Sequence, residues 1–136
     1  EARNSDKVWR VVNWLMSVNG GKSGGFFERY GPSITPPAPP VGIVGWAWAE
    51  IVSLVFENIM GVRPGIDALV IRPNLLDGVN EMNASFSIRG VAVTLSLKKT
   101  TGEPSVRVNG KPRTMENGSF TMKYPSGGSL NIEMSV

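Results

Sequence analysis

The spacing of apolar side chains changes along the chain, and this change limits the fold more than any other feature. Over residues 5–18 the apolar residues recur at helical spacing, as on one face of a helix. From Asp67 onward they alternate with polar residues, most clearly over residues 81–88 and 91–98. A helical period followed by an alternating one predicts an α+β chain in which the helices precede a sheet.

The first expected helix starts at Ser5 or Asp6 and runs to about Val18. Residues 19–21 (NGG) follow it and supply a left-handed stop. A long segment rich in glycine and proline, residues 19–45, then precedes the second helix. It reads as a flexible linker or, because it also carries apolar side chains, as a functional loop.

The second expected helix runs from about Trp46 to Met60 and stops at Gly61. Apolar side chains cover nearly its whole circumference, and such a helix must be buried on most sides. One neighbouring helix and one small sheet supply little cover. We therefore expect helix 46–60 to pack against a missing N-terminal portion of a larger protein or against a homo-oligomer partner.

The alternating part of the chain is divided by turn dipeptides. Asn-Gly pairs stand at residues 109–110 and 117–118, and Asn-Gly between alternating runs is the strongest short signal for a hairpin. Short strands with turns about every ten residues indicate an antiparallel sheet or a small β-sandwich. The expected division is a helical part at residues 1–63 and an antiparallel β-sandwich at residues 64–136.

The chain contains neither cysteine nor histidine. Disulfides, thiol nucleophiles, histidine-based triads and the usual zinc sites are therefore excluded, and we expect no cofactor and no metal. Any chemistry must come from carboxylates, hydroxyls, lysine, arginine or tyrosine. A chain without cysteine is compatible with the cytoplasm, the periplasm or secretion, and of these we favour the periplasm or secretion.

Charge and hydropathy argue against two further classes of partner. The net charge is +3, but the basic residues are scattered, so we expect no nucleic-acid partner. Residues 31–49 carry no charge, but five prolines break this stretch, so we expect no membrane span. The first residue is Glu1 and not methionine, from which we expect a processed or partial chain.

Four segments carry a resemblance to a known family. They are residues 26–31 (FFERYG), 45–49 (GWAWA), 61–75 (GVRPGIDALVIRPNL) and 106–111 (VRVNGK). Their order and spacing resemble the C-terminal end of bacterial six-hairpin glycoside hydrolases, the superfamily of glucoamylases, trehalases and processing-type α-glucosidases. The resemblance implies the last helices of an (α/α)₆ barrel followed by a β-sandwich.

The resemblance also implies roles for individual residues. Glu28 stands where glucoamylase-like enzymes hold their catalytic base, and the alternative for it is a surface ion pair. Tyr30, Trp46 and Trp48 are candidate sugar-binding residues, and core packing is the alternative for the two tryptophans. Such enzymes mostly invert, with a water held between carboxyl groups about 6.5–9.5 Å apart. The general acid of relatives lies upstream of the part represented here, so we expect this chain to be inactive alone.

Two other classes of function remain open from the sequence. One is a non-catalytic β-sandwich that binds carbohydrate or another protein, with the helices as decoration. The other is a free-standing structural or oligomerising protein. Glycosidase activity that depends on Glu28 would distinguish the hydrolase hypothesis from both of these alternatives.

Overall fold

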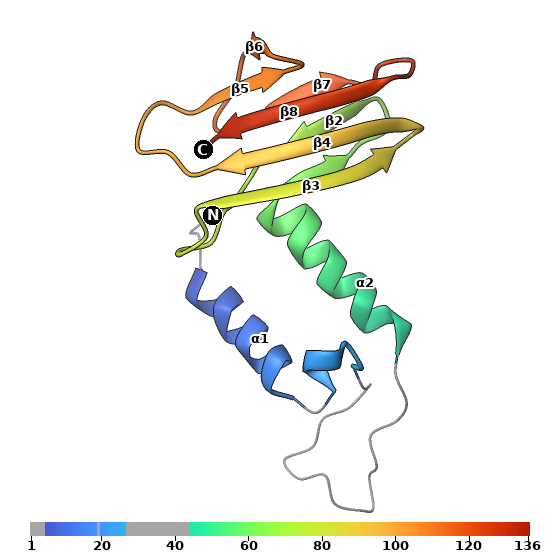
Figure 1. Cartoon of the computed structure of the whole chain (residues 1–136), viewed down its shortest axis with the longest axis vertical. Coiled ribbons are helices and arrows are strands. Elements are labelled where there is room, and N and C mark those ends of the chain that lie inside the picture. Colours follow the sequence, from blue (N-terminus) through green and yellow to red (C-terminus); the bar gives the residue numbers. More distant parts are fainter. Residues whose placement is uncertain (1–4, 19, 27–43) are drawn as a thin grey trace, which may run out of the picture. The chain divides into compact units, whose positions relative to one another are not determined.

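The computed structural model describes residues 5–18, 20–26 and 44–136. Within these ranges the chain is a mixed α+β protein with two α-helices and two β-sheets (Figure 1). This confirms the α+β class expected from the change of period. Contacts along the chain group Glu1–Leu54 into one compact unit and Val55–Val136 into another, and each unit is described by itself.

The first unit starts with helix α1 (Ser5–Ser17), close to its expected bounds. Gly20 follows with a φ of 81°, the left-handed conformation expected of the stop after this helix. A single 3₁₀ turn, η1 (Gly21–Ser23), comes next. The backbone N–H of Val44 donates to the carbonyl oxygen of Phe26 at 3.0 Å, so the described residues on either side of the gap at 27–43 lie side by side.

The second helix differs from its expected form in its last turns. Helix α2 (Gly45–Ser53) is α-helical, and the chain continues as a π-helix, η2 (Leu54–Ile59). The N–H of Met60 donates to the carbonyl oxygen of Val55 at 2.8 Å, a bond between residues five apart. The wider turn adds a residue and so rotates the end of the helix. Gly61 then ends the helix with a φ of 73°, as the sequence predicted.

Eight strands form the two sheets of the second unit. In chain order they are β1 (Val62–Pro64), β2 (Ala68–Ile71), β3 (Glu81–Ile88), β4 (Val91–Lys98), β5 (Ser105–Val108), β6 (Lys111–Arg113), β7 (Phe120–Lys123) and β8 (Ser129–Ser135). One sheet has the order β1-β2-β7 and the other the order β3-β4-β8-β5-β6. The two short strands β1 and β6 were not expected as separate strands.

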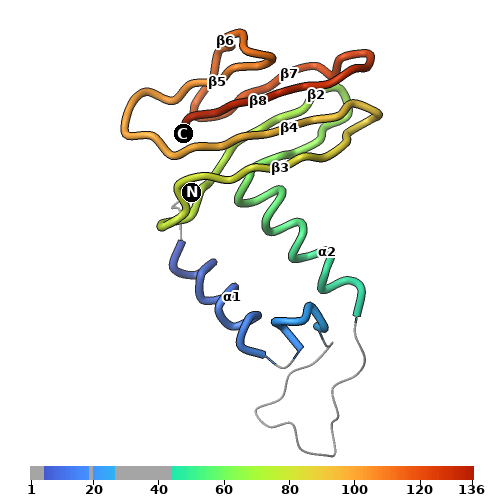
Figure 2. Tube along the Cα trace, in the orientation of Figure 1, coloured from blue at the N-terminus to red at the C-terminus, as the bar shows by residue number. Residues whose placement is uncertain are grey.

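The five-stranded sheet contains one parallel pair. Strand β8 runs parallel to β4 on one side and antiparallel to β5 on the other, as the arrows in Figure 1 show, and the trace in Figure 2 shows β8 between the two. The sequence predicted antiparallel pairing throughout, and the β4–β8 pair is an exception to it. Because β8 lies between them, it joins the β3–β4 hairpin and the β5–β6 hairpin into one sheet.

Three two-residue turns connect antiparallel partners in the second unit: the strands of the β3–β4 hairpin, the strands of the β5–β6 hairpin, and the two residues of an isolated bridge. Their central residues are Arg89-Gly90, Asn109-Gly110 and Asn117-Gly118, and each of these residues has a positive φ. Positive φ at both central positions is the requirement of a type I′ turn, whose twist matches that of the flanking strands. The hairpin expected at Asn109-Gly110 is therefore confirmed. At Asn117-Gly118 the turn closes only the isolated bridge between Glu116 and Ser119, because the strands on either side of it, β6 and β7, belong to different sheets.

The core of the second unit lies between the facing sides of the sheets. Its fully buried side chains include Leu69 and Ile71 from β2, Leu95 from β4 and Ile132 from β8. Burying each side chain of this size contributes about 1.5–3 kcal/mol relative to exposure. Phe56 of η2 joins the edge of this core, with its ring centre 4.8 Å from that of Phe86 on β3. Most of the outward-facing residues of the strands are polar, so the unit has one core.

Candidate functional site

The sequence-predicted site residues fall partly outside the described part of the chain. Glu28 and Tyr30 lie in the segment 27–43, outside the described residues. Trp46 and Trp48 both lie in the first half of α2. The geometry of the candidate site can therefore be built from the two tryptophans and from their neighbours in the same unit.

Trp48 packs against the segment that follows α1. Its ring meets that of Phe26 edge to face, with a centroid distance of 5.6 Å. A Cβ atom placed on Gly24 would come within 2.6 Å of the Trp48 ring, so only glycine allows this approach. Gly24 also has a φ of 77°, which favours glycine for a second reason. These contacts fix the position of the Trp48 indole while leaving 45% of the residue exposed.

Trp46 is more open, with 62% of its surface exposed. It precedes Trp48 by two positions, and a helix turns about 100° per residue. The two indoles are therefore separated by roughly 200° around α2 and do not form one continuous platform. A sugar ring stacked on Trp48 would lie on the side of the helix away from Trp46. The two candidate sugar-binding residues must therefore act separately or serve different purposes.

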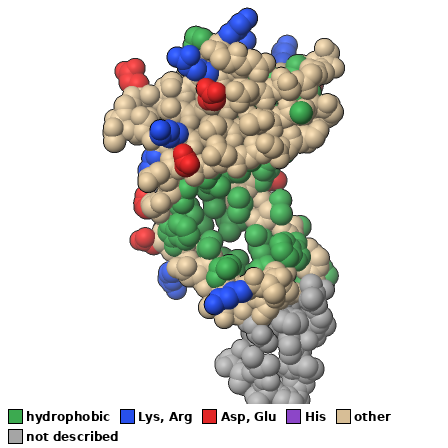
Figure 3. All heavy atoms as spheres, viewed as in Figure 1, with side chains coloured by type: hydrophobic (Ala, Val, Ile, Leu, Met, Phe, Trp, Pro, Cys, Tyr) green, Lys and Arg blue, Asp and Glu red, His purple; other side chains and the backbone are tan. Residues whose placement is uncertain are grey.

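Apolar side chains are exposed along both helices of the first unit. The large hydrophobic residues with more than two-fifths of their surface exposed there are Val11, Trp14, Met16, Trp46, Trp48 and Val52. Figure 3 shows hydrophobic side chains gathered over the helical part of the chain. In α2 no residue is buried, although the sequence of this helix is apolar nearly all round. Exposed apolar side chains gathered in this way usually mark a contact with another protein segment or with a ligand.

Other acidic residues offer no second site in the described residues. The side chains of Glu50 on α2 and Glu57 on η2 are exposed. Across residues 5–18, 20–26 and 44–136, no three acidic side chains are grouped as a metal ion would require. In the same ranges, no helix combines the length and the hydropathy needed to cross a membrane. In the first unit, the aromatic residues of α2 are therefore the described side chains best suited to contact a ligand.

Neither a family model nor a curated protein matches this chain in comparisons with known proteins. The resemblance to six-hairpin glycosidases therefore rests on the four segments of the sequence alone. Sequence reasoning also missed a group of side chains on the outer face of the three-stranded sheet, since Arg63 and Arg72 are nine positions apart and come together only through strand pairing.

Proposed function

We propose that this chain is the C-terminal part of a glycoside hydrolase built on an (α/α)₆ barrel, with an accessory β-sandwich. The supporting observation is the exposed apolar surface of α1 and α2, two helices that a barrel would cover with its other helices. The order of the four resembling segments supports the same assignment. In this proposal the preceding part of the protein, and not a second copy of the chain, covers helix 46–60.

Glu28 is the general base in this mechanism. Its carboxylate accepts a proton from a water molecule while the oxygen of that water attacks the anomeric carbon of the sugar. The bond from that carbon to the leaving oxygen breaks, and a general acid from the preceding part of the protein protonates the leaving oxygen. The attack inverts the configuration of the anomeric carbon. Trp48, whose position is fixed by Phe26 and Gly24, offers its exposed face to a sugar ring.

The test is the replacement Glu28→Gln in the full-length protein, with Glu50→Gln as its matched control. Both changes remove one carboxylate charge, and Glu50 is exposed on α2. We expect Glu28→Gln to lower kcat on oligosaccharide substrates by about 100-fold or more, while Glu50→Gln leaves it within about twofold. Circular dichroism establishes that both variants fold. Equal turnover in the two variants would remove Glu28 from catalysis.

A non-catalytic saccharide-binding or protein-interaction module is the second candidate. Its support is the complete core of Val55–Val136, which includes residues from both sheets. If this candidate is correct, the 136-residue chain binds saccharide or a protein partner without cleaving any glycosidic bond, and the full-length protein is equally inactive. Hydrolysis by the full-length protein that depends on Glu28 excludes this candidate.

A further inference from the structure

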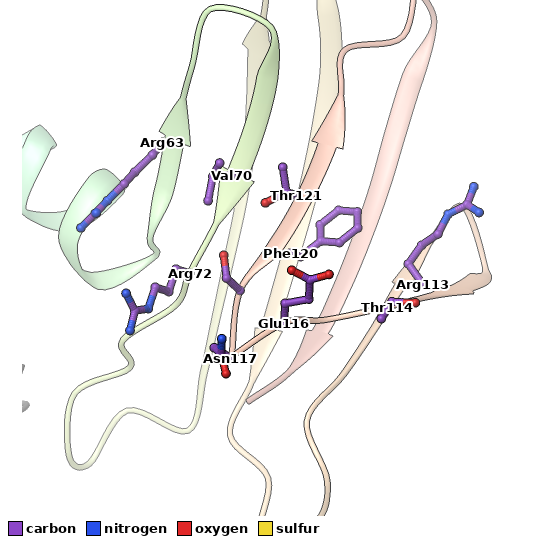
Figure 4. Close-up of a pocket in the computed structure, with 10 residues that line it drawn as sticks. Arg63, Val70, Arg72, Arg113, Thr114, Glu116, Asn117, Phe120 and Thr121 are labelled. Atoms are coloured by element: carbon purple, nitrogen blue, oxygen red, sulfur yellow. The ribbon is translucent and has the colours of Figure 1, made fainter.

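A hollow on the outer face of the three-stranded sheet brings arginine and hydroxyl side chains together. Its volume is about 740 Å³. Strands β1, β2 and β7 and the segment 113–119 line it, and all of them belong to the Val55–Val136 unit (Figure 4). Pockets that hold small organic ligands have volumes of about 300–1,000 Å³, so the hollow has room for one or two sugar rings.

Strand pairing explains why two arginines meet here. Val70 on β2 pairs with Arg63 on β1 and with Thr121 on β7, so these three side chains form a row on one face of the sheet. Arg72 comes two positions after Val70 and therefore points to the same face. Its backbone N–H donates to the carbonyl oxygen of Gly61 at 2.9 Å, and this glycine places no side chain beside the arginines. Arg63 and Arg72 thus lie on the same side of the hollow (Figure 4).

The arginines of the hollow are poorly neutralised. Neither Arg72 nor Arg113 makes a side-chain hydrogen bond or an ion pair with a described residue. Arg63 donates through Nε to the backbone oxygen of Glu57 at a long 3.5 Å, which leaves its other donors available. Glu116 is the one acidic residue of the lining, so three arginines against one glutamate leave an excess of two positive charges.

The remaining lining is mainly neutral and polar. It includes the hydroxyl groups of Thr114, Ser119 and Thr121 and the amide of Asn117. Hydroxyls and amides both donate and accept hydrogen bonds, as a ligand rich in hydroxyl groups requires. Figure 4 shows Arg113 on the side of the hollow opposite Arg63 and Arg72, with its guanidinium directed away from the sheet. Arg113 therefore adds positive potential from one side, while Arg63 and Arg72 lie together on the other side of the hollow.

We propose that this hollow binds an acidic saccharide, whose carboxylate or sulfate group is held by Arg63 and Arg72. Guanidinium groups match the geometry of such oxyanions and form paired, charge-assisted hydrogen bonds with them. The hydroxyl and amide side chains form hydrogen bonds with the neutral hydroxyl groups of the sugar. The site lies wholly within the sandwich, so it does not depend on the chain being part of a hydrolase.

The test is calorimetric titration of the 136-residue chain with three probes at low salt. Trigalacturonate carries carboxylates, a sulfated disaccharide carries sulfate, and maltotriose is neutral. We expect the two acidic probes to bind and maltotriose not to bind. Inorganic sulfate at equal concentration should compete only weakly, because it makes no contact with the hydroxyl and amide side chains. Comparison of the two acidic probes identifies the anion that the site prefers.

Three variants locate the site. Arg72→Gln should weaken binding of the acidic probe about tenfold or more, since it removes a charge-assisted contact. Glu116→Gln should strengthen it, because it removes the one negative charge of the lining. Arg107→Gln is the matched control, an exposed arginine on β5 in the other sheet, and should leave binding unchanged.

Two outcomes would overturn the proposal. One is the absence of binding by either acidic probe, and the other is an equal loss in the Arg72 and Arg107 variants, which indicates non-specific attraction to positive charge. Binding of inorganic sulfate as tight as that of the sulfated disaccharide would overturn the saccharide assignment. Thermal unfolding of each variant establishes that any loss of binding is not a loss of fold.

Discussion

The guanidinium carbon of Arg89 lies 4.7 Å from the centre of the Tyr124 ring, at an end of the sandwich where three chain segments meet. Both side chains donate a hydrogen bond to the carbonyl oxygen of Gly65, each at 3.2 Å. Gly65 lies in the β1–β2 turn, Arg89 in the β3–β4 turn, and Tyr124 directly after β7. Since β3 and β4 belong to one sheet and β1, β2 and β7 to the other, this contact connects the two sheets.

We expect Tyr124→Phe to lower the free energy of unfolding by about 1 kcal/mol. The ring and its cation–π contact with Arg89 remain, while the hydrogen bond to Gly65 is lost. Urea denaturation of the 136-residue chain measures the change. Tyr124→Leu should cost more, because it also removes the aromatic face under Arg89. An unchanged midpoint for Tyr124→Phe would show that the hydrogen bond contributes nothing.

We expect Gly61→Ala to be among the most damaging single changes, at more than about 3 kcal/mol. A Cβ atom on Gly61 would lie 1.9 Å from the carbonyl oxygen of Arg72, and both groups are backbone. The control is Gly90→Ala, which has a similar positive φ but no atom within 4 Å of the added Cβ. Strain alone should cost the control about 1 kcal/mol. Thermal unfolding separates crowding from strain, and equal losses would contradict the close approach at Gly61.

The two Asn-Gly turns should respond differently to the same replacement. The side-chain oxygen of Asn109 accepts a hydrogen bond from the backbone N–H of Asn131, with 2.7 Å between the two atoms. This bond extends the contact between β5 and β8. Asn117 has the same φ of 50° but makes no side-chain hydrogen bond with a described residue. We expect Asn109→Ala to destabilise the chain by about 1 kcal/mol more than Asn117→Ala. Denaturant midpoints of the two variants measure this difference. Equal midpoints would contradict a stabilising role for the Asn109 side chain.

The features predicted from the sequence are those that depend on near neighbours. Strands β3 and β4 follow from alternation, and the turns at Asn109 and Asn117 follow from the tolerance of Asn-Gly for positive φ. Gly61 ends its helix for the same local reason. These preferences hold whatever the rest of the chain does, which is why the sequence alone indicates them.

The features missed depend on distant partners. Alternation in β8 is the same whether its neighbour runs parallel or antiparallel, so the β4–β8 pairing could not be inferred. The π-helix from Leu54 to Ile59 has no sequence signal that separates it from an α-helix of the same composition. Arg63 and Arg72 become neighbours only through the register of β1 with β2. In the candidate site, the sequence placed Trp46 and Trp48 on their helix, but the contact of Trp48 with Phe26 joins residues 22 positions apart and could not be inferred.

The position of β8 has a consequence for the order in which the protein is made. Residues 129–135 are translated after the other seven strands of the described residues, yet they occupy the middle of the five-stranded sheet. On the ribosome, the β3–β4 and β5–β6 hairpins must wait with unfilled neighbouring edges until this segment has left the exit tunnel. During that interval the unpaired edges of the two hairpins can pair with strands of other molecules. Chaperone binding during translation should therefore be strongest then.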